Sequence, residues 1–324
     1  MNIPDASLFL SAAEQKEVLK RDDLKGLWEV IKSWAIIFIT FAVVFNYPNV
    51  LTIIIGLFVL GGRQLAISVL MHDTSHKSLF RTSWMNDFFG NWFGGYPILN
   101  DMLRYRPYHV KHHVHTGLEE DPDTNLTKGY PSGKQSLFRK FTRDLSGMTG
   151  MKTTLALLMM HLNYLAYDQG NNPKRIDQSN RSWSSFFQTF YKNLSGPIIS
   201  NLVLFGVVSF VFAPWVYSLW LIAFMTTFQF CIRIRAIAEH SMIEHPTDPY
   251  ENTRTTYANI FEKLLFAPHN VNYHAEHHML MGVPCYNLPK MHQMIKSKGF
   301  FEKGHLAKSY WEVVSMAATS KTLH

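Results

Sequence analysis

Four apolar segments, arranged as two closely spaced pairs, constrain the fold of this 324-residue chain more than any other feature. The first pair comprises residues 30–45 and 50–71, and the second comprises residues 197–212 and 215–232. Crossing the hydrocarbon core takes roughly 20 apolar residues, with about 17 as a practical lower limit. The segments meet this requirement, the shorter ones marginally. Because a short turn joins the members of each pair, each pair is predicted to form a helical hairpin that enters and leaves the membrane on one side.

The distribution of positive charge predicts how these hairpins are oriented. Lysine and arginine are absent from both hairpin turns, and nearly all of them fall before residue 33, between residues 77 and 192, and after residue 232. Cytoplasmic segments of membrane proteins carry an excess of these residues. Both termini and the segments 72–196 and 233–324 are therefore predicted to be cytoplasmic.

These patterns together predict an all-α integral membrane protein that forms a single domain over residues 1–324. Four transmembrane helices, as two hairpins, would carry a cytoplasmic helical cap. A bacterial inner membrane is favoured, with the endoplasmic reticulum membrane as the alternative. The net charge of +7 could suggest nucleic acid. The basic residues form no compact stripe, however, and membrane orientation explains their placement, so no nucleic-acid partner is predicted.

Some segments allow more than one interpretation. Arg63, inside an apolar segment, is either a bundle-facing or snorkelling arginine, or a polar contact near the substrate or the ligand-bearing helix. Residues 84–99 and 153–167 are too short for comfortable spans and are predicted to be interfacial or re-entrant helices. Residues 168–181 are polar and predict an exposed loop.

Histidine clusters carry the chemical information in the sequence. His72 and His76 lie in HDTSH, directly after an apolar segment, and two further motifs, HVKHH and HAEHH, follow. Spacings of three and four place side chains on one face of a helix. His240, just past the fourth apolar segment, adds a ninth residue at the same predicted depth. The nine candidate metal ligands are His72, His76, His109, His112, His113, His240, His274, His277 and His278.

The number of histidines narrows the choice of metal. Imidazole suits zinc, copper, iron and nickel. A structural zinc ion takes four ligands and a catalytic one usually three from the protein. Nine histidines are too many for one ion and about right for two ions of higher coordination. His115 and His269 adjoin the motifs and remain open, whereas surface or core roles are predicted for His161, His245, His292, His305 and His324.

The order HxxxH, HxxHH, HxxHH resembles the membrane fatty-acid desaturase and hydroxylase superfamily over about residues 50–293. The stretches at 112–123 and 267–292 resemble its acyl-lipid desaturase and related hydroxylase branch. The resemblance implies a four-helix membrane bundle and two irons held by the nine histidines without bridging carboxylates. It also suggests Asn270 as a water-mediated contact. Some relatives have an asparagine one turn before the equivalent of His240, where this chain has Ala236.

Acidic residues beside the motifs are candidates for orienting the ligands. Ligating histidines usually donate their second ring N–H to a carboxylate or carbonyl. The candidates by position are Asp73, Asp121, Asp123, Glu239 and Glu276.

The function implied by the resemblance is O₂-dependent oxidation of a lipid C–H bond, with introduction of a double bond into an acyl chain as the principal prediction. The alternative within the superfamily is a hydroxylase or ketolase acting on a carotenoid, sterol or other lipid. A metal transporter is less favoured, because transporters place their ligands near the bilayer midplane. The chain has no heme, flavin or cysteine-cluster signature, so an external electron donor, a ferredoxin or cytochrome b5-like protein, is expected.

Overall fold

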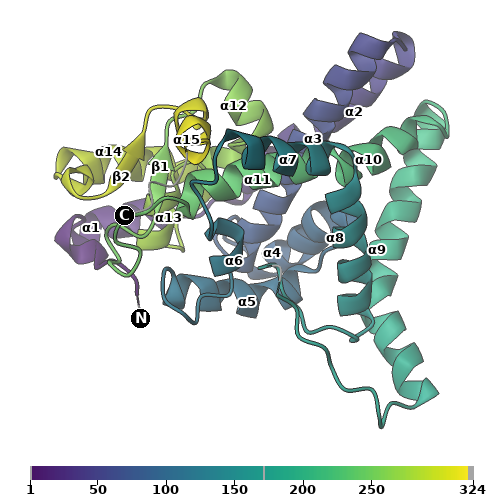
Figure 1. The fold of residues 1–324 in the computed structure, drawn as a ribbon, viewed down its shortest axis with the longest axis horizontal. Coiled ribbons are helices and arrows are strands. Elements are labelled where there is room, and N and C mark those ends of the chain that lie inside the picture. The colour runs from purple at the N-terminus through teal and green to yellow at the C-terminus, as the bar shows by residue number, and fades with distance from the viewer. Residues whose placement is uncertain (1, 171, 320–324) are drawn as a thin grey trace.

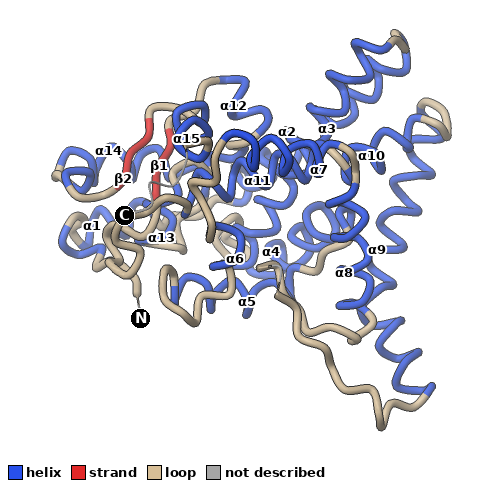
Figure 2. Tube along the Cα trace, viewed as in Figure 1, coloured by secondary structure: helices blue, strands red, loops and turns tan. Residues whose placement is uncertain are grey.

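The computed structural model describes residues 2–170 and 172–319, and it consists largely of helices (Figures 1 and 2). Strands β1 (Arg254–Thr256) and β2 (His305–Ala307) pair in parallel, with Arg254 opposite His305. Apart from this short strand pair, the regular secondary structure of the described residues is helical, as predicted.

Four long apolar helical segments dominate the described part of the chain and confirm the prediction of a helical protein with four membrane-length helices. Helices α2 (Asp23–Asn46) and α3 (Val50–Ser75) form the first hairpin. Helix α9 (Trp183–Val211) is followed by α10 (Val216–Met225), which continues as α11 (Thr227–His240). Both hairpin turns lie at the upper right of Figure 1, whereas α1 and α14 lie on the far left.

These helices are longer than the apolar segments that predict them. Helix α3 continues to Ser75, so that His72 lies in its last turn, and α11 continues to His240. Helix α9 begins at Trp183, well before Pro197, because Ser182 accepts a hydrogen bond from the Ser185 N–H and caps the helix. The apolar segment predicts a later start because the stretch before Pro197 includes the polar residues Lys192, Asn193 and Ser195.

Helix α3 lies at the centre of the bundle, and most of its second half is buried. Gly61 permits α11 to approach closely, because a Cβ atom there would lie 2.4 Å from Thr227 Oγ1. Arg63 is buried and donates hydrogen bonds to the carbonyls of Lys263 and Leu264 at the end of α12. Arg63 is therefore a bundle-facing arginine that satisfies a helix C-terminus.

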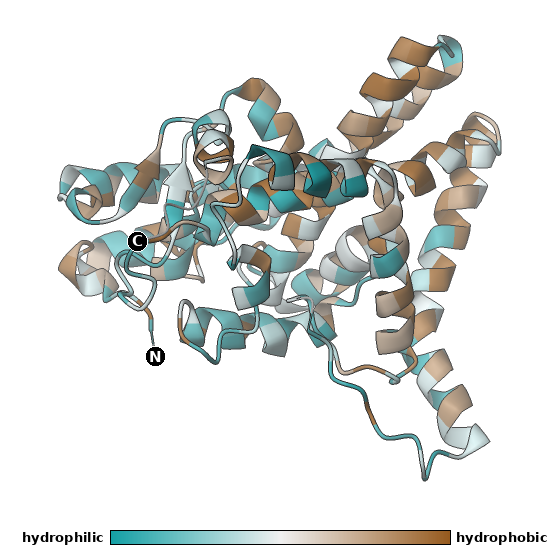
Figure 3. Ribbon diagram, viewed as in Figure 1, coloured by the Kyte–Doolittle hydropathy of each residue, from teal (hydrophilic) through white to brown (hydrophobic). Residues whose placement is uncertain are grey.

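The outward faces of the long helices are apolar. The side chain of Phe210 on α9 is 93% exposed and that of Ile39 on α2 is 61% exposed, whereas Phe41 is fully buried. The α2–α3 hairpin is mostly brown in Figure 3, in contrast to the mixed colours of the elements on the left. Large exposed apolar faces of this kind fit contact with lipid.

Shorter elements surround the bundle. Residues 83–98 are helical throughout, as α4 (Ser83–Phe89), η2 (Gly90–Gly95) and η3 (Tyr96–Ile98). Of the second ambiguous stretch, residues 153–161 are helical and belong to α8 (Met148–His161), whereas residues 162–167 are not helical. Within its described residues, segment 168–181 has no helix, as predicted. The remaining elements are η1 (Ala6–Leu8), α1 (Ala12–Val18), α5 (Met102–His115), α6 (Thr124–Thr127), α7 (Lys134–Leu145), α12 (Ile260–Leu265), η4 (Pro268–Asn270), α13 (His274–Met279), η5 (Cys285–Asn287), α14 (Leu288–Ser297), η6 (Phe300–Glu302) and α15 (Tyr310–Ala317).

Candidate metal centre

The structure brings all nine predicted histidines together in two adjacent groups. In each group one donor atom per residue lies within 4.8 Å of the others. The centroids of the His113 and His278 rings, one from each group, are only 4.2 Å apart. The five-histidine group contains His72, His76, His109, His113 and His277, and the four-histidine group contains His112, His240, His274 and His278.

Helix geometry explains how the two HxxHH motifs are divided. Successive residues of an α-helix are about 100° apart, so residues i and i+4 share a stripe and residue i+3 lies on the next one. In α5, His109 and His113 therefore belong to one group and His112 to the other. Helix α13 repeats the pattern, with His277 separated from its two neighbours. Each helix thus contributes to both groups.

The spacing of nitrogen atoms fits metal binding. The Nε2 atom of His113 lies 3.0 Å from Nε2 of His109 and 3.1 Å from Nε2 of His277. In the other group, Nε2 of His274 and Nε2 of His240 are 2.8 Å apart. Two imidazole nitrogens that bind one ion at about 2.1 Å and at right angles are about 3.0 Å apart. Among the described residues, the buried Nε2 atoms of His72, His76 and His278 have no hydrogen-bond partner, and an ion would supply one.

Outer partners orient four of the histidines through their Nδ1 atoms. Asp73 accepts from His72 at 2.9 Å, and Asp121 accepts from His112 at 2.8 Å. The Nδ1 atom of His240 lies 3.2 Å from the Asn252 carbonyl oxygen, and that of His278 lies 3.3 Å from Thr116 Oγ1. Such contacts leave Nε2 free for a metal, as is usual for metal-binding histidines. Position next to a motif suggested Asp73 and Asp121, but no sequence signal pointed to Thr116 or Asn252.

The other candidate orienting residues have different partners. Asp123 accepts a hydrogen bond from the Tyr108 hydroxyl, and its carboxylate lies 3.6 Å from His112. Glu239 pairs with Arg235 at 2.6 Å and lies 3.4 Å from His274 Nδ1.

Glu276 and Asn270 contact residues other than the nine histidines. Glu276 binds His292 at 2.5 Å and accepts a hydrogen bond from the Thr255 hydroxyl. Asn270 donates to the Cys285 carbonyl. These two side chains therefore support the loops around α13.

The remaining histidines lie apart from both groups. His269 is buried between Glu29, at 2.5 Å, and Ser33, at 2.8 Å, so both of its ring nitrogens already have partners. His161 binds the Leu99 carbonyl and His292 binds Glu276, as satisfied core histidines. Three others, His115, His245 and His305, lie on or near the surface. His324 lies outside the described residues.

Burial keeps most of the clustered imidazoles neutral, which is the form that binds metal. It lowers the pKa of His76 to about 3 and holds the pKa values of His109 and His113 well below the ordinary 6.5. His112 is different: burial would lower its pKa, but Asp123 and the hydrogen bond to Asp121 raise it.

Acidification is expected to destabilise the metal-free protein in detergent. Between pH 6.5 and about 3, the unfolded chain binds protons that folded His76 does not, so stability is fully present above pH 6.5 and declines below it. Each such histidine contributes a slope of at most about 1.4 kcal/mol per pH unit. Thermal unfolding at pH 7.5, 6.5 and 5.5 should show a falling midpoint, and a constant or rising midpoint would contradict the assignment.

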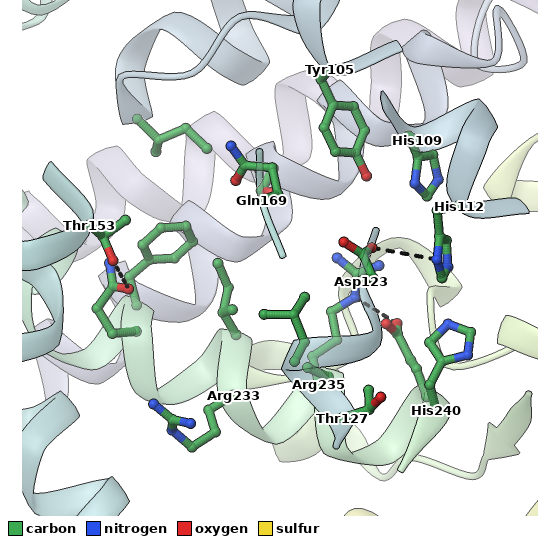
Figure 4. Close-up of a pocket in the computed structure, with 18 of the residues that line it drawn as sticks. Tyr105, His109, His112, Asp123, Thr127, Thr153, Gln169, Arg233, Arg235 and His240 are labelled. Atoms are coloured by element: carbon green, nitrogen blue, oxygen red, sulfur yellow. Dashed lines mark hydrogen bonds and ion pairs between the residues drawn. The ribbon is translucent and has the colours of Figure 1, made fainter. Parts of the chain in front are cut away.

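A cavity of about 260 Å³ adjoins the histidines. Its wall near the metal centre includes His109 and His112, and Tyr105 points into it from α5 (Figure 4). The rest of the wall has a substantial apolar part that includes Leu157, Phe224 and Phe228. Sequence reasoning missed these wall residues, although Tyr105 lies one helical turn before His109.

Four apolar, membrane-length helices define a membrane protein. Two buried groups of histidines that could hold metal ions lie at the ends of these helices and beside a partly apolar cavity. Comparison with known families makes this class specific. The model of the family "Fatty acid desaturase" matches residues 47–310, so the chain belongs to the fatty acid desaturase family and is an oxidoreductase of the desaturase type. The predicted resemblance is confirmed.

Curated relatives agree with the family match at low identity. Dihydrorhizobitoxine desaturase of Bradyrhizobium elkanii is 27% identical over 290 residues, which cover 86% of this chain and 77% of that protein. The sn-1 oleoyl-lipid 12-desaturase of Picosynechococcus sp. is 24% identical over an alignment that covers 93% of this chain and 86% of that protein. The sn-1 oleoyl-lipid 12-desaturase of Anabaena variabilis is 26% identical over an alignment that covers 68% of this chain and 62% of that protein.

Proposed function

We propose that this protein introduces a double bond into the acyl chain of a membrane lipid, using O₂ and two iron ions held by the nine histidines. The observation that carries the proposal is the pair of buried imidazole groups beside a partly apolar cavity. The similarity to two sn-1 oleoyl-lipid 12-desaturases supports an acyl lipid as the substrate.

Each histidine group would hold one ion. Iron in such a site would supply the oxidising power, drawn from O₂, that removes hydrogen from an unactivated C–H bond. Asp73 and Asp121 fix the orientation of His72 and His112. Asp123 and Glu239 lie near the ligands as well, at 3.6 Å from His112 and 3.4 Å from His274. Glu276 and Asn270 support the loops around α13.

The cavity would hold the acyl chain and exclude water. Its apolar wall at Leu157, Phe224 and Phe228 accommodates methylene groups, while His109 and His112 border the opposite part of the wall. A chain that lies along this wall brings its C–H bonds close to both histidine groups. Holding reacting atoms in place contributes strongly to the rate, because a shift of about 1 Å can cost roughly 10²-fold.

The electrons would come from a separate protein, a ferredoxin or cytochrome b5-like donor. The net charge of +7 would favour association with an acidic donor.

The proposed orientation places both termini and the histidine groups in the cytoplasm, with the hairpin turns outside. A Tyr47→Cys variant should react with an impermeant thiol reagent from outside intact cells, and an Asn180→Cys variant only after the membrane is opened. Both positions are exposed, and the native Cys231 and Cys285 are buried, which limits background labelling. The opposite labelling pattern would overturn this topology.

Lipid analysis tests the reaction itself. Cells that express the chain with a donor system should accumulate acyl lipids two mass units lighter than those of cells carrying a His112→Ala variant. A product sixteen units heavier would instead identify a hydroxylase. Changes confined to carotenoids or sterols would refute an acyl substrate.

A further inference from the structure

Two tyrosines on α5 lie one helical turn before a histidine of each group. Residues i and i+4 are neighbours on a helix surface, and Tyr105 precedes His109 as Tyr108 precedes His112. The rings of Tyr105 and His109 are stacked, with centroids 4.9 Å apart and an interplanar angle of 16°. Tyr105 therefore contacts the five-histidine group through an aromatic surface.

The aromatic contacts continue away from the metal centre. The Tyr105 and Tyr108 rings have centroids 6.4 Å apart, and the Tyr108 and Tyr167 rings are 5.8 Å apart. Tyr108 and Tyr167 are only half-buried, so the row leads from the buried histidines toward the surface. Tyr167 lies beyond α8, far from α5 in the sequence, so the fold and not a local motif brings the row together.

The middle tyrosine has a proton acceptor in place. The Tyr108 hydroxyl donates a hydrogen bond to Asp123 Oδ1 at 2.5 Å. Loss of an electron from a phenol is accompanied by loss of its proton, and this hydrogen bond gives the proton a destination.

We infer that Tyr105, Tyr108 and Tyr167 form a relay that supplies electrons to the metal centre when O₂ has been reduced without a lipid in the cavity. The inference rests on the proposed function. Tyrosine gives up an electron only to a strong oxidant, so the row does not serve as the entry route for a low-potential donor protein. The row instead reduces the oxidised metal centre before that centre oxidises nearby side chains.

Reduction of O₂ to water takes four electrons; the donor protein supplies two, and the lipid C–H bonds normally supply the other two. Without lipid, two successive one-electron transfers from Tyr108 replace them, and each time the phenolic proton passes to Asp123 and is consumed in forming water. A small thiol returns a hydrogen atom to each tyrosyl radical, and the two thiyl radicals combine into a disulfide.

The test uses the iron-loaded enzyme with its donor system and O₂, with and without lipid. Wild type, Tyr108→Phe and the control Tyr191→Phe, which changes a 76% exposed tyrosine on α9, are compared. Without lipid, Tyr108→Phe should lose subsequent activity several-fold faster than the other two. Millimolar thiol should protect wild type but not Tyr108→Phe. Freeze-quenched wild type should show a tyrosyl radical signal by electron paramagnetic resonance, weakened in Tyr108→Phe.

The possible outcomes distinguish failure of the relay from failure of the proposed function. Equal inactivation rates and no radical in an enzyme that still desaturates lipid would overturn the relay alone. A Tyr108→Phe variant that is equally impaired with lipid present would show a structural role and also overturn it. An enzyme that forms no desaturated product with lipid would instead refute the proposed function. Mass spectrometry adds a readout independent of turnover. Without lipid, Met71 in the cavity wall should be oxidised more in Tyr108→Phe than in wild type.

Discussion

Replacement of His277 by alanine is expected to lower the bound iron from about two ions to about one per chain and to reduce product formation by at least about 10²-fold. His277 is buried, belongs to the five-histidine group and lies 3.1 Å from His113 through their Nε2 atoms. Even outer partners of metal ligands typically contribute 10–100-fold to affinity or activity, so a direct ligand should contribute at least as much.

Iron analysis and lipid analysis on the same purified samples check this expectation. The matched control is His245→Ala, which removes an exposed histidine outside both groups and should change neither value. A His277→Ala protein with two irons and normal turnover, or active wild-type protein that contains stoichiometric zinc, would rule out the proposed centre.

Filling the cavity is expected to abolish turnover while leaving the metal in place. Ala236 lies on α11 and lines the cavity one turn before His240. An Ala236→Phe substitution would place a phenyl ring where the acyl chain is proposed to lie, and activity should fall by about 10²-fold or more, since a displacement of about 1 Å can already have that effect. Ala236→Ser, which adds a single oxygen, should retain most of the activity.

The measurement pairs product formation with iron content and thermal stability. Iron close to wild type in Ala236→Phe shows that the fold and both histidine groups are intact, so that the loss reflects the cavity. Full activity with the phenyl ring in place would mean that the substrate reaches the metal centre by another route.

The sequence predicted the membrane helices from short-range apolar patterns. It predicted the convergence of the nine histidines from the spacing within each motif, the predicted topology and the family resemblance. Apolar length identified all four spans, but it placed the end of the last span at residue 232, whereas the helix continues to His240. Residues 233–240 are amphipathic, and their polar face is stabilised by packing partners such as Asp144, which binds Arg233.

Contacts between distant segments could not be predicted in the same way. Thr116 supports His278 across 162 positions of the chain, and no local spacing marks it. The cavity likewise depends on walls from α3, α5, α8, α10 and α11 together. The division of each HxxHH motif between two groups agrees with helical geometry, which separates residue i+3 from residues i and i+4 by part of a turn.

The division of the histidines also has a consequence for biosynthesis. The five-histidine group has four members before residue 114 but needs His277, and the four-histidine group needs His274 and His278. Neither group is complete until α13 has left the ribosome and both hairpins have been inserted. Because ion binding stabilises only a chain that has assembled its ligands, the proposed iron ions would be acquired only after α13 has emerged, and chains truncated before α13 would stay metal-poor.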